Sequence, residues 1–325
     1  MSTELDTDRL EVFARAAAAE HGLPDGELTL LNVSENATYR LDGDGRRIVL
    51  RVHRTGYHSR DAVHSELTWI QALRDEGIVR TAPVVPAPDG REVVEVRHPD
   101  GEQRMVVGFE WMDGVSPPED RLVDDFRELG SITARLHAHA RRWQRPEGFT
   151  RFTWDYDTSL GDRGHWGRWQ DGLGVGPSEL DVLGRCADAV RRRLEAFGRG
   201  PDRFGLVHAD MRLANLLVDG PDVGVIDFDD CGFSWYLYDL GSSLSFIEHL
   251  PIVPELVDSW VTGYQTVAPL SPEEIDELPT FIMLRRMLLV AWIGSHSAVP
   301  EAQALGSDFT LGSCDLAEAY LTQIG

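Results

Sequence analysis

Four side chains that can bind a metal ion or move a proton lie in one short stretch of the sequence. The stretch LVHADMRLANLLVDGPDVGVID contains His208, Asp210 and Asn215 after an apolar run, and Asp227 at the end of a later run. Apolar runs separated by Asp, Gly and Pro are typical of short strands joined by turns. We therefore expect a hairpin that presents Asp210, Asn215 and Asp227 near one another. Mg²⁺ prefers carboxylate and amide oxygens together with phosphate oxygens, which indicates phosphoryl transfer.

The spacing His-x-Asp-x-x-x-x-Asn matches the catalytic loop of kinases, in which the Asp accepts a hydroxyl proton and the Asn binds metal. This pattern makes Asp210 the catalytic residue and Asn215 and Asp227 the metal ligands. His208 would support the loop by hydrogen bonds. A hydrolase metal site built from His208, Asp210 and Asp227 is an alternative, but it leaves the spacing to Asn215 as a coincidence.

The segments HADMRLANLLVD, VIDFDD and YDLG resemble, in this order, the aminoglycoside phosphotransferase and choline kinase family. RRMLLVAWIGSH resembles a C-terminal helix of its homoserine-kinase-like and stress-response-kinase branch, and the resemblance covers about residues 25 to 300. It implies an α+β, two-lobed, protein-kinase-like fold. The N-lobe would be a small antiparallel sheet with one main helix, and the C-lobe would be larger and mostly helical. ATP and Mg²⁺ are the implied cofactors.

Asp239, in YDLG, begins a predicted helix, where its carboxylate can cap free backbone N–H groups. The resemblance gives the same residue a second role, because the corresponding Asp in related proteins braces the catalytic loop.

Residues 1–110 are expected to form the nucleotide-binding lobe. Strands are predicted over 28–33, 39–41, 48–52, 92–96 and 105–112, and the repeated Asp-Gly at 42–45 is a strong hairpin signal. From the loop Ser34–Thr38, Ser34, Asn36 and backbone N–H groups are candidates to meet phosphate. This loop has no glycine, so an ordinary β-turn is the alternative.

The resemblance implies a basic residue near the end of the third strand that contacts the nucleotide phosphates. Arg51 is the candidate for this residue. The chain contains no lysine, and Arg51 alternates with Leu50 and Val52, so its side chain points to the opposite face. Glu66 lies inside the apolar stripe of a helix predicted from Ser59 to Glu76. A buried carboxylate is unfavourable unless it is paired, so we expect it to pair with Arg51. The alternative places Glu66 at the edge of the stripe, in water.

A hinge is expected at about 109–116, where the composition changes to Gly, Pro and acidic residues. Adenine would hydrogen-bond to backbone groups around Glu110 to Met112. Residues 111–325 would form the catalytic and substrate-binding lobe, with helices at 122–143 and 177–197 and throughout the C-terminal part.

Acceptor contacts are harder to assign from the sequence. The segment 151–176 is irregular and rich in tryptophan, which favours a functional role over disorder. It is expected to help form the wall of an acceptor pocket, although packing over the lower lobe explains it as well. The candidate substrate contacts are Trp154, Asp155, Trp235 and Arg285.

Composition excludes several other classes of protein. The net charge of −23 argues against nucleic acid as a partner, and it fits either a cationic substrate or a general surface adaptation. Three scattered cysteines indicate a reducing compartment. The acidic N-terminus lacks a signal-peptide core, and Arg285 and Arg286 interrupt the most apolar run, so we expect a cytoplasmic protein without a membrane span.

Together these features predict an ATP-dependent kinase that phosphorylates a hydroxyl of a small molecule. An amino alcohol, a hydroxy amino acid or an aminoglycoside-like antibiotic is the expected acceptor, by analogy with the family. A catalytically weak, nucleotide-binding regulator is one alternative, and a Ser/Thr protein kinase is another. The short segment after Asp227 offers little platform for a peptide, which favours small molecules.

Overall fold

The computed structural model describes residues 7–118, 121–297 and 299–324, and the chain divides into two compact units. The first unit comprises the described residues up to Val115 together with Arg145–Arg151 and Leu217–Asp229. The second unit comprises the remaining described residues. Two later segments therefore pack into the first unit. The predicted division of the chain at a single point, near residue 110, does not include them.

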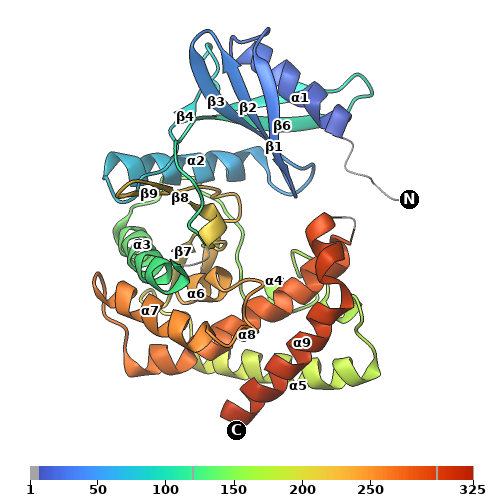
Figure 1. Cartoon of the computed structure of the whole chain (residues 1–325), viewed down its shortest axis with the longest axis vertical. Coiled ribbons are helices and arrows are strands. Elements are labelled where there is room, and N and C mark those ends of the chain that lie inside the picture. Colours follow the sequence, from blue (N-terminus) through green and yellow to red (C-terminus); the bar gives the residue numbers. More distant parts are fainter. Residues whose placement is uncertain (1–6, 119–120, 298, 325) are drawn as a thin grey trace. The chain divides into compact units, whose positions relative to one another are not determined.

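The first unit is built on a six-stranded antiparallel sheet (Figure 1). The strand order is β1-β2-β3-β6-β4, and β5 also pairs with β6. The strands are β1 (Glu27–Val33), β2 (Ala37–Gly43), β3 (Arg46–Val52), β4 (Val84–Val85), β5 (Val93–Arg97) and β6 (Gln103–Glu110). The short strand β4 is absent from the sequence prediction, since two residues carry no readable alternation.

Two helices complete this sheet. Helix α1 (Thr7–Glu20) contributes Phe13 and Ala17 to a core that also holds Leu50, and all three are fully buried. Helix α2 (Arg60–Asp75) begins at Ser59, whose hydroxyl accepts the backbone N–H of Ala62 at 3.2 Å. This is the N-cap arrangement that Ser favours. Helix α2 lies close to the range predicted from the sequence, Ser59 to Glu76.

A hairpin of β8 (Leu216–Asp219) and β9 (Asp222–Val225) also belongs to the first unit from Leu217 onward. Val218 bridges to Val115, and Gly224 bridges to Arg80. The glycine at 224 leaves room for the Met112 side chain, because a Cβ there would lie 2.3 Å from the Cε of Met112.

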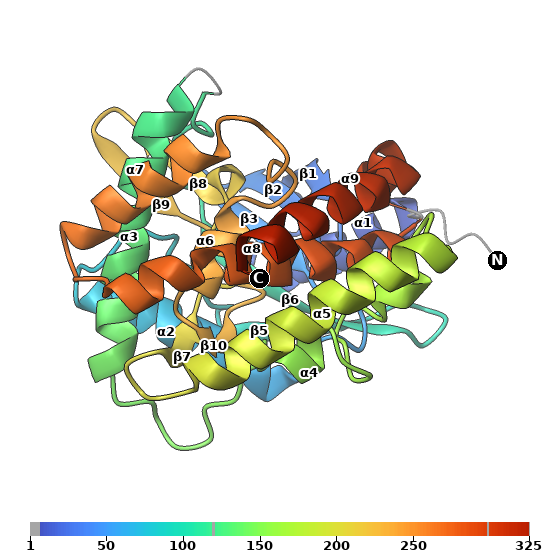
Figure 2. The ribbon, with the colours of Figure 1, turned by 90° about the horizontal axis from the view of Figure 1, so that it is seen from below.

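The second unit is mostly helical. Its long helices α5, α8 and α9 pack against one another and run side by side in Figure 2, and α3 packs along α7. Its helices are α3 (Leu122–Arg142), α4 (Tyr156–Ser159), α5 (Pro177–Phe197), α6 (Tyr238–Ser243), α7 (Val253–Gln265), α8 (Pro272–Ser295) and α9 (Pro300–Ile324). Short 3₁₀ turns, η2 (Trp169–Asp171) and η3 (Leu213–Asn215), complete it.

The second unit also contains a two-stranded sheet that the sequence did not predict. Strand β7 (Phe204–Val207) pairs with β10 (Gly232–Trp235), whereas β8 pairs with β9. The expectation that β7, β8 and β9 form one hairpin is therefore wrong in its pairing. A strand partner that lies well beyond the next turn leaves no local signal in the sequence.

Helix α8 is long and apolar enough to cross a membrane by length and composition alone. Most of its apolar window, 78%, is nevertheless buried inside the protein. Burial of this extent is typical of the core helix of a folded domain.

The antiparallel sheet of the first unit and the helices of the second unit confirm the predicted α+β class.

Close packing between α3 and α7 provides a test of the fold. A Cβ on Gly263 would lie 1.8 Å from the carbonyl oxygen of Arg127, so we expect Gly263→Ala to lower the free energy of unfolding by about 1–3 kcal/mol. Gly184 on α5 is the matched control, because its Cβ would meet only Trp169 at 4.0 Å. Gly184→Ala should raise stability by about 0.5–1 kcal/mol, as Gly→Ala does inside helices. Urea unfolding measures both, and equal effects would contradict the packing described.

Candidate active site

Asp210 lies in the loop that connects β7 to η3, and Asn215 is the last residue of η3. The amide nitrogen of Asn215 donates to the Asp210 carboxylate at 2.9 Å and to the Asp210 carbonyl at 2.8 Å. Asn215 is buried, and its amide nitrogen is committed to Asp210, so its amide oxygen is the atom left for a metal ion. The proximity of these two residues, predicted from their spacing, is present in the second unit.

Two arginines flank the Asp210 carboxylate. Arg285 of α8 donates to it at 2.8 Å, and Arg212 lies 3.3 Å away. Burial alone would raise the pKa of Asp210, but the charges of Arg212 and Arg285 hold this pKa below its ordinary value. Asp210 is therefore a charged acceptor in the folded protein. Arg285 is itself buried and is fixed by Ser245 at 2.9 Å and by Tyr238 at 3.1 Å.

The residue before Asp210 has a strained backbone. Ala209 has a φ of 67°, in the left-handed region that non-glycine residues rarely adopt. Asp239 holds it there, because its carboxylate accepts the N–H of Ala209 at 2.7 Å and the N–H of His208 at 3.2 Å. Arg285 adds a hydrogen bond to the Ala209 carbonyl at 3.3 Å.

These bonds settle which of its two expected roles Asp239 fills. The expectation that its carboxylate caps its own helix is wrong: the N-cap of α6 is Leu237, with no side-chain cap bond. The implied bracing of the catalytic loop is present instead. The physical reason is that the loop amides of His208 and Ala209 occupy both carboxylate oxygens.

His137 of α3 supports Asp239 in turn. Its Nε2 lies 2.9 Å from the Asp239 carboxylate, and its Nδ1 lies 3.1 Å from the Tyr264 hydroxyl. His137 is fully buried, and burial lowers its pKa below the ordinary value despite the neighbouring carboxylate. The second histidine of this helix, His139, is also buried, so both are structural residues of the second unit.

In the first unit, Arg51 and Glu66 form the predicted ion pair. The Nη2 of Arg51 lies 2.8 and 2.9 Å from the two Glu66 oxygens, and both side chains are buried. The alternative with Glu66 in water is thereby excluded. Burial disfavours the charged guanidinium, but Glu66, Asp229 and Asp227 outweigh it and raise the pKa of Arg51.

Asp227 follows β9 and also belongs to the first unit. Its carboxylate lies 3.8 Å from Nη1 of Arg51, and its side chain is 51% exposed. Its φ of 61° is again left-handed. An exposed carboxylate next to a buried guanidinium suits a ligand of a hard cation such as Mg²⁺.

The loop between β1 and β2 is shorter than predicted, because β2 already begins at Ala37. The N–H of Ser34 donates to the carbonyl of Asn36 at 3.3 Å. Asn36 itself is engaged at both ends of its amide: its oxygen accepts the N–H of Arg54 at 3.0 Å, and its nitrogen donates to Asp229 at 2.8 Å. Glu35 pairs with Arg54.

Asp229 is the centre of a buried polar cluster that sequence reasoning did not assign. Besides Asn36, its carboxylate lies 3.4 Å from Nδ1 of His53. Its backbone carbonyl accepts hydrogen bonds from His58, at 2.8 Å, and from Arg151. Burial would raise the pKa of Asp229, but His53 and the Arg51 charge lower it well below the ordinary value. The sequence feature that could have pointed to Asp229 is its position two residues after Asp227.

The predicted adenine-binding backbone lies at the end of β6. The N–H of Glu110 donates to the carbonyl of Pro83 at 2.9 Å, and that of Trp111 donates to Arg47 at 3.3 Å. The side chain of Met112 reaches Gly224. All of these groups belong to the first unit.

Three of the candidate acceptor contacts are engaged in packing inside the second unit. Trp154 and Trp235 are both 1% exposed, and their indole nitrogens donate to the carbonyls of Asp230 and Gly198. Asp155 caps α4 and pairs with Arg199 at 3.0 Å. The fourth candidate, Arg285, contacts Asp210 directly.

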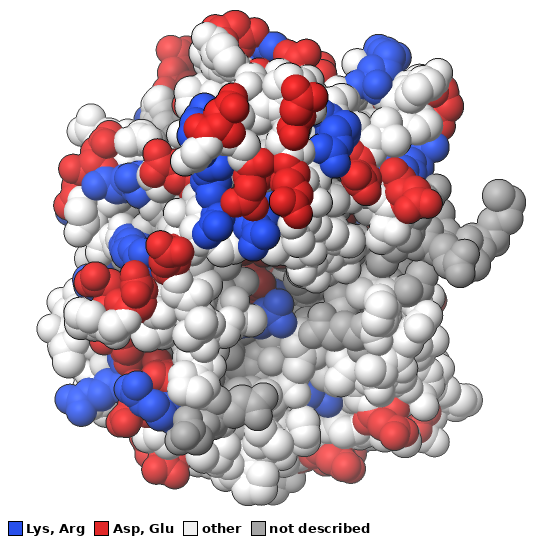
Figure 3. All heavy atoms as spheres, turned by 45° about the horizontal axis from the view of Figure 1, so that its top comes forward, with Lys and Arg blue, Asp and Glu red and all other residues white. Residues whose placement is uncertain are grey.

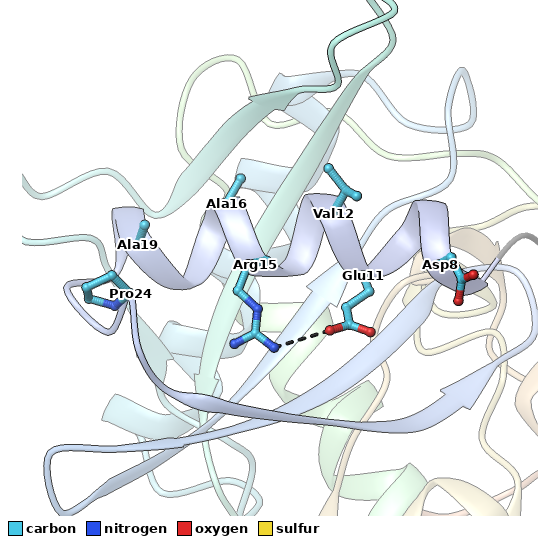
Figure 4. Close-up of a pocket in the computed structure, with 7 residues that line it drawn as sticks. All are labelled: Asp8, Glu11, Val12, Arg15, Ala16, Ala19 and Pro24. Carbon is cyan, nitrogen blue, oxygen red and sulfur yellow. Dashed lines mark hydrogen bonds and ion pairs between the residues drawn. The ribbon is translucent and has the colours of Figure 1, made fainter.

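A separate depression of about 440 Å³ lies on α1 (Figure 4). An ion pair between Arg15 and Glu11, at 3.2 Å, crosses it. It holds none of the predicted site residues. The residues that line it are Asp8, Glu11, Val12, Arg15, Ala16, Ala19 and Pro24.

The burial of His58 predicts acid sensitivity. Burial lowers the pKa of His58 from 6.5 to about 3, although Asp229 raises it, while Arg151 and His53 lower it further. The stabilising contribution is complete above pH 6.5 and is lost as the pH falls towards 3, because only the unfolded chain takes up the proton. The free energy of unfolding should fall by up to about 1.4 kcal/mol per pH unit in this window.

His58→Gln retains a donor for the Asp229 carbonyl but cannot take up this proton. The free energy of unfolding of this variant should therefore fall less steeply with falling pH, by up to about 1.4 kcal/mol per pH unit. Urea unfolding at several pH values measures the slope, and His64→Gln, at a partly exposed position of α2, is the matched control. Equal slopes for the wild type and His58→Gln would contradict the assignment.

Comparison with known proteins places these features in a family. Residues 27–278 match the phosphotransferase enzyme family. The solved structure of the microcompartment-associated aminopropanol kinase is 48% identical, with a TM-score of 0.90, and the match covers 96% of this chain and 98% of that chain. Amicoumacin kinase of Bacillus subtilis (strain 168) is 26% identical over 284 residues, which cover 84% of this chain and 81% of that protein.

The solved structure of amicoumacin kinase hAmiN, in complex with AMP-PNP, Ca²⁺ and Ami, is 23% identical. Its TM-score is 0.77, with 97% of this chain and 96% of that chain covered, and at this identity the likeness shows the fold. The predicted family resemblance and ATP-dependent kinase activity are confirmed by these matches. The chain belongs to the phosphotransferase enzyme family and is an ATP-dependent small-molecule kinase.

Proposed function

We propose that this protein transfers the γ-phosphoryl group of ATP to the hydroxyl of a small amino alcohol, in the cytoplasm and with Mg²⁺. The observation that carries the proposal is the Asp210 carboxylate, held in a charged state by Arg212, Arg285 and Asn215. A charged, positioned carboxylate is the group that a kinase needs to accept a hydroxyl proton.

Asp210 takes the proton of the acceptor hydroxyl. A new bond forms between the acceptor oxygen and the γ-phosphorus, and the bond from that phosphorus to the bridging oxygen of ADP breaks. Asn215 and Asp227 would hold Mg²⁺, which would neutralise charge on the phosphates. His208 and Asp239 support the catalytic loop, and the strain at Ala209 is the price of presenting Asp210.

The nucleotide is assigned to residues of the first unit. Arg51, oriented by Glu66, donates to the phosphate oxygens, and Ser34 and Asn36 belong to the loop that covers them. Adenine forms hydrogen bonds with backbone groups around Glu110 to Met112. In this proposal residues 1–110 form the nucleotide-binding lobe, residues 111–325 form the catalytic lobe, and 109–116 is the hinge.

The acceptor class rests on similarity and not on surface charge. The relative with 48% identity is an aminopropanol kinase, whose acceptor carries both an amine and a hydroxyl. Figure 3 shows acidic and basic side chains interspersed on the face that it draws. Arg9, for example, forms ion pairs with Asp100 and Glu102. Part of the acidic surface is thus neutralised locally, which makes net charge a weak guide to the substrate.

A hydroxyl-bearing antibiotic is the second candidate acceptor. The similarity to amicoumacin kinase over most of both chains favours it. Its lower identity, 26% against 48%, places it after the amino alcohol.

The acceptor is tested by ADP release with Mg²⁺ and ATP. We expect turnover with aminopropanol, with lower or no turnover for ethanolamine, choline, homoserine, amicoumacin and aminoglycosides. Asp210→Asn should lower kcat by about 10²- to 10⁴-fold, since it removes the proton acceptor and preserves size. Asp188→Asn, at an exposed position of α5, is the matched control. An unchanged kcat in Asp210→Asn would contradict the role of Asp210 as the proton acceptor.

Arg51→Lys tests the nucleotide assignment. The guanidinium faces Glu66 with one nitrogen and Asp227 with the other, which a single ammonium group cannot reproduce. We expect the KM for ATP to rise about tenfold, equivalent to about 1.4 kcal/mol. Arg46→Lys, at the exposed start of β3, serves as the control. An unchanged KM for ATP in Arg51→Lys would separate Arg51 from the nucleotide.

A further inference from the structure

Within the first unit, the loop Ser34–Asn36 is hydrogen-bonded to Asp229, which follows Asp227 by two residues in the chain. Asn36 donates to the carboxylate of Asp229 at 2.8 Å, and Asp229 lies two residues after Asp227. We infer that Asn36 and Asp229 form a latch that couples nucleotide binding to metal binding. This inference rests on the proposed function, and it gives Asn36 a positioning role instead of a direct phosphate contact.

The first step concerns the capacity of Asn36. Its amide oxygen accepts the N–H of Arg54 at 3.0 Å, while its amide nitrogen donates to Asp229. Both ends of the amide are thus used within the protein. A side chain committed in this way orders its own loop, and the loop backbone is closed further by the bond from Ser34 N–H to the Asn36 carbonyl.

The second step concerns how firmly Asp229 is anchored. It is 6% exposed, and its carbonyl is held by His58 and Arg151, which come from different segments of the first unit. Its neighbour Phe228 is 1% exposed and packs edge-on against Trp69. Residues 228 and 229 therefore form a fixed point for the chain.

The third step concerns Asp227. Its left-handed φ of 61° costs about 1–2 kcal/mol for a residue with a Cβ, so its surroundings must impose it. On its N-terminal side, the N–H of Val225 donates to the carbonyl of Arg80 at 2.8 Å. On its C-terminal side the fixed point is Asp229. The conformation that turns the Asp227 carboxylate towards Arg51 thus depends on the residue to which Asn36 is bonded.

The consequence is an energetic link between the two ligands. A nucleotide that orders the loop strengthens the bond from Asn36 to Asp229, which in turn favours the backbone conformation in which Asp227 binds metal. By reciprocity, a metal ion bound at Asp227 favours the closed loop and tighter nucleotide binding.

The test compares the Kd of AMP-PNP with Mg²⁺ and with EDTA, by calorimetry, for wild type, Asn36→Ala and Asn32→Ala. The ratio of the two Kd values measures how strongly the metal tightens nucleotide binding. The binding of Mg²⁺ to free AMP-PNP in solution is the same for every variant, so it cancels when the ratios of two variants are compared. We expect this ratio to fall about tenfold in Asn36→Ala, which corresponds to about 1.4 kcal/mol. Asn32→Ala, an exposed position on β1, should keep the wild-type ratio.

Other outcomes overturn the inference in distinguishable ways. Equal weakening of both Kd values in Asn36→Ala, with an unchanged ratio, would return Asn36 to a direct phosphate contact and exclude the latch. No AMP-PNP binding by the wild type would overturn the proposed function and the latch with it.

Two further measurements test the latch, and the second does not depend on nucleotide affinity. Asn36→Ala should have a smaller effect on the ratio in an Asp229→Asn background than in the wild type, whereas full additivity would exclude a direct coupling. Amide hydrogen exchange at Arg54, whose N–H bonds to Asn36, should accelerate in Asn36→Ala and stay unchanged in Asn32→Ala. Unchanged exchange at Arg54 in both variants would contradict the latch.

Discussion

The buried carboxylate of Asp239 is the interaction on which the catalytic loop depends. It is fully inaccessible to solvent, and it accepts the backbone N–H groups of His208 and Ala209. A charge in that position is tolerated because His137 and these two amides replace the lost water. Its loss would remove the hydrogen bonds to the N–H groups of His208 and Ala209 that hold Ala209 in its left-handed conformation next to Asp210.

The first unit solves a similar problem with different residues. Asp227 also has a left-handed backbone, and Asp229, two residues later, supplies the buried anchor. In both units an accessible acid is thus positioned by a more deeply buried acid that is bonded to its own surroundings. Strain of this kind persists only where neighbouring groups over-determine the conformation.

Arginine carries every basic role in this chain, since lysine is absent. Arg51 pairs with Glu66, Arg285 with Asp210 and Arg286 with Glu248, and all three arginines are buried. A guanidinium offers several donors in a fixed plane, so it can satisfy a carboxylate and further acceptors at once. Arg285 shows this, because it reaches Asp210, Ser245 and Tyr238 together.

The sequence by itself determined the features that depend on near neighbours. The spacing of Asp210 and Asn215 brought them together, Ser59 marked the start of α2, and the alternation around Arg51 turned it towards Glu66. Only the tertiary structure decided which strand pairs with β7, that Trp154 and Trp235 are buried, and that Asn36 bonds to Asp229. These outcomes join residues far apart in the chain, and their energies come from pairing and burial that no local pattern encodes.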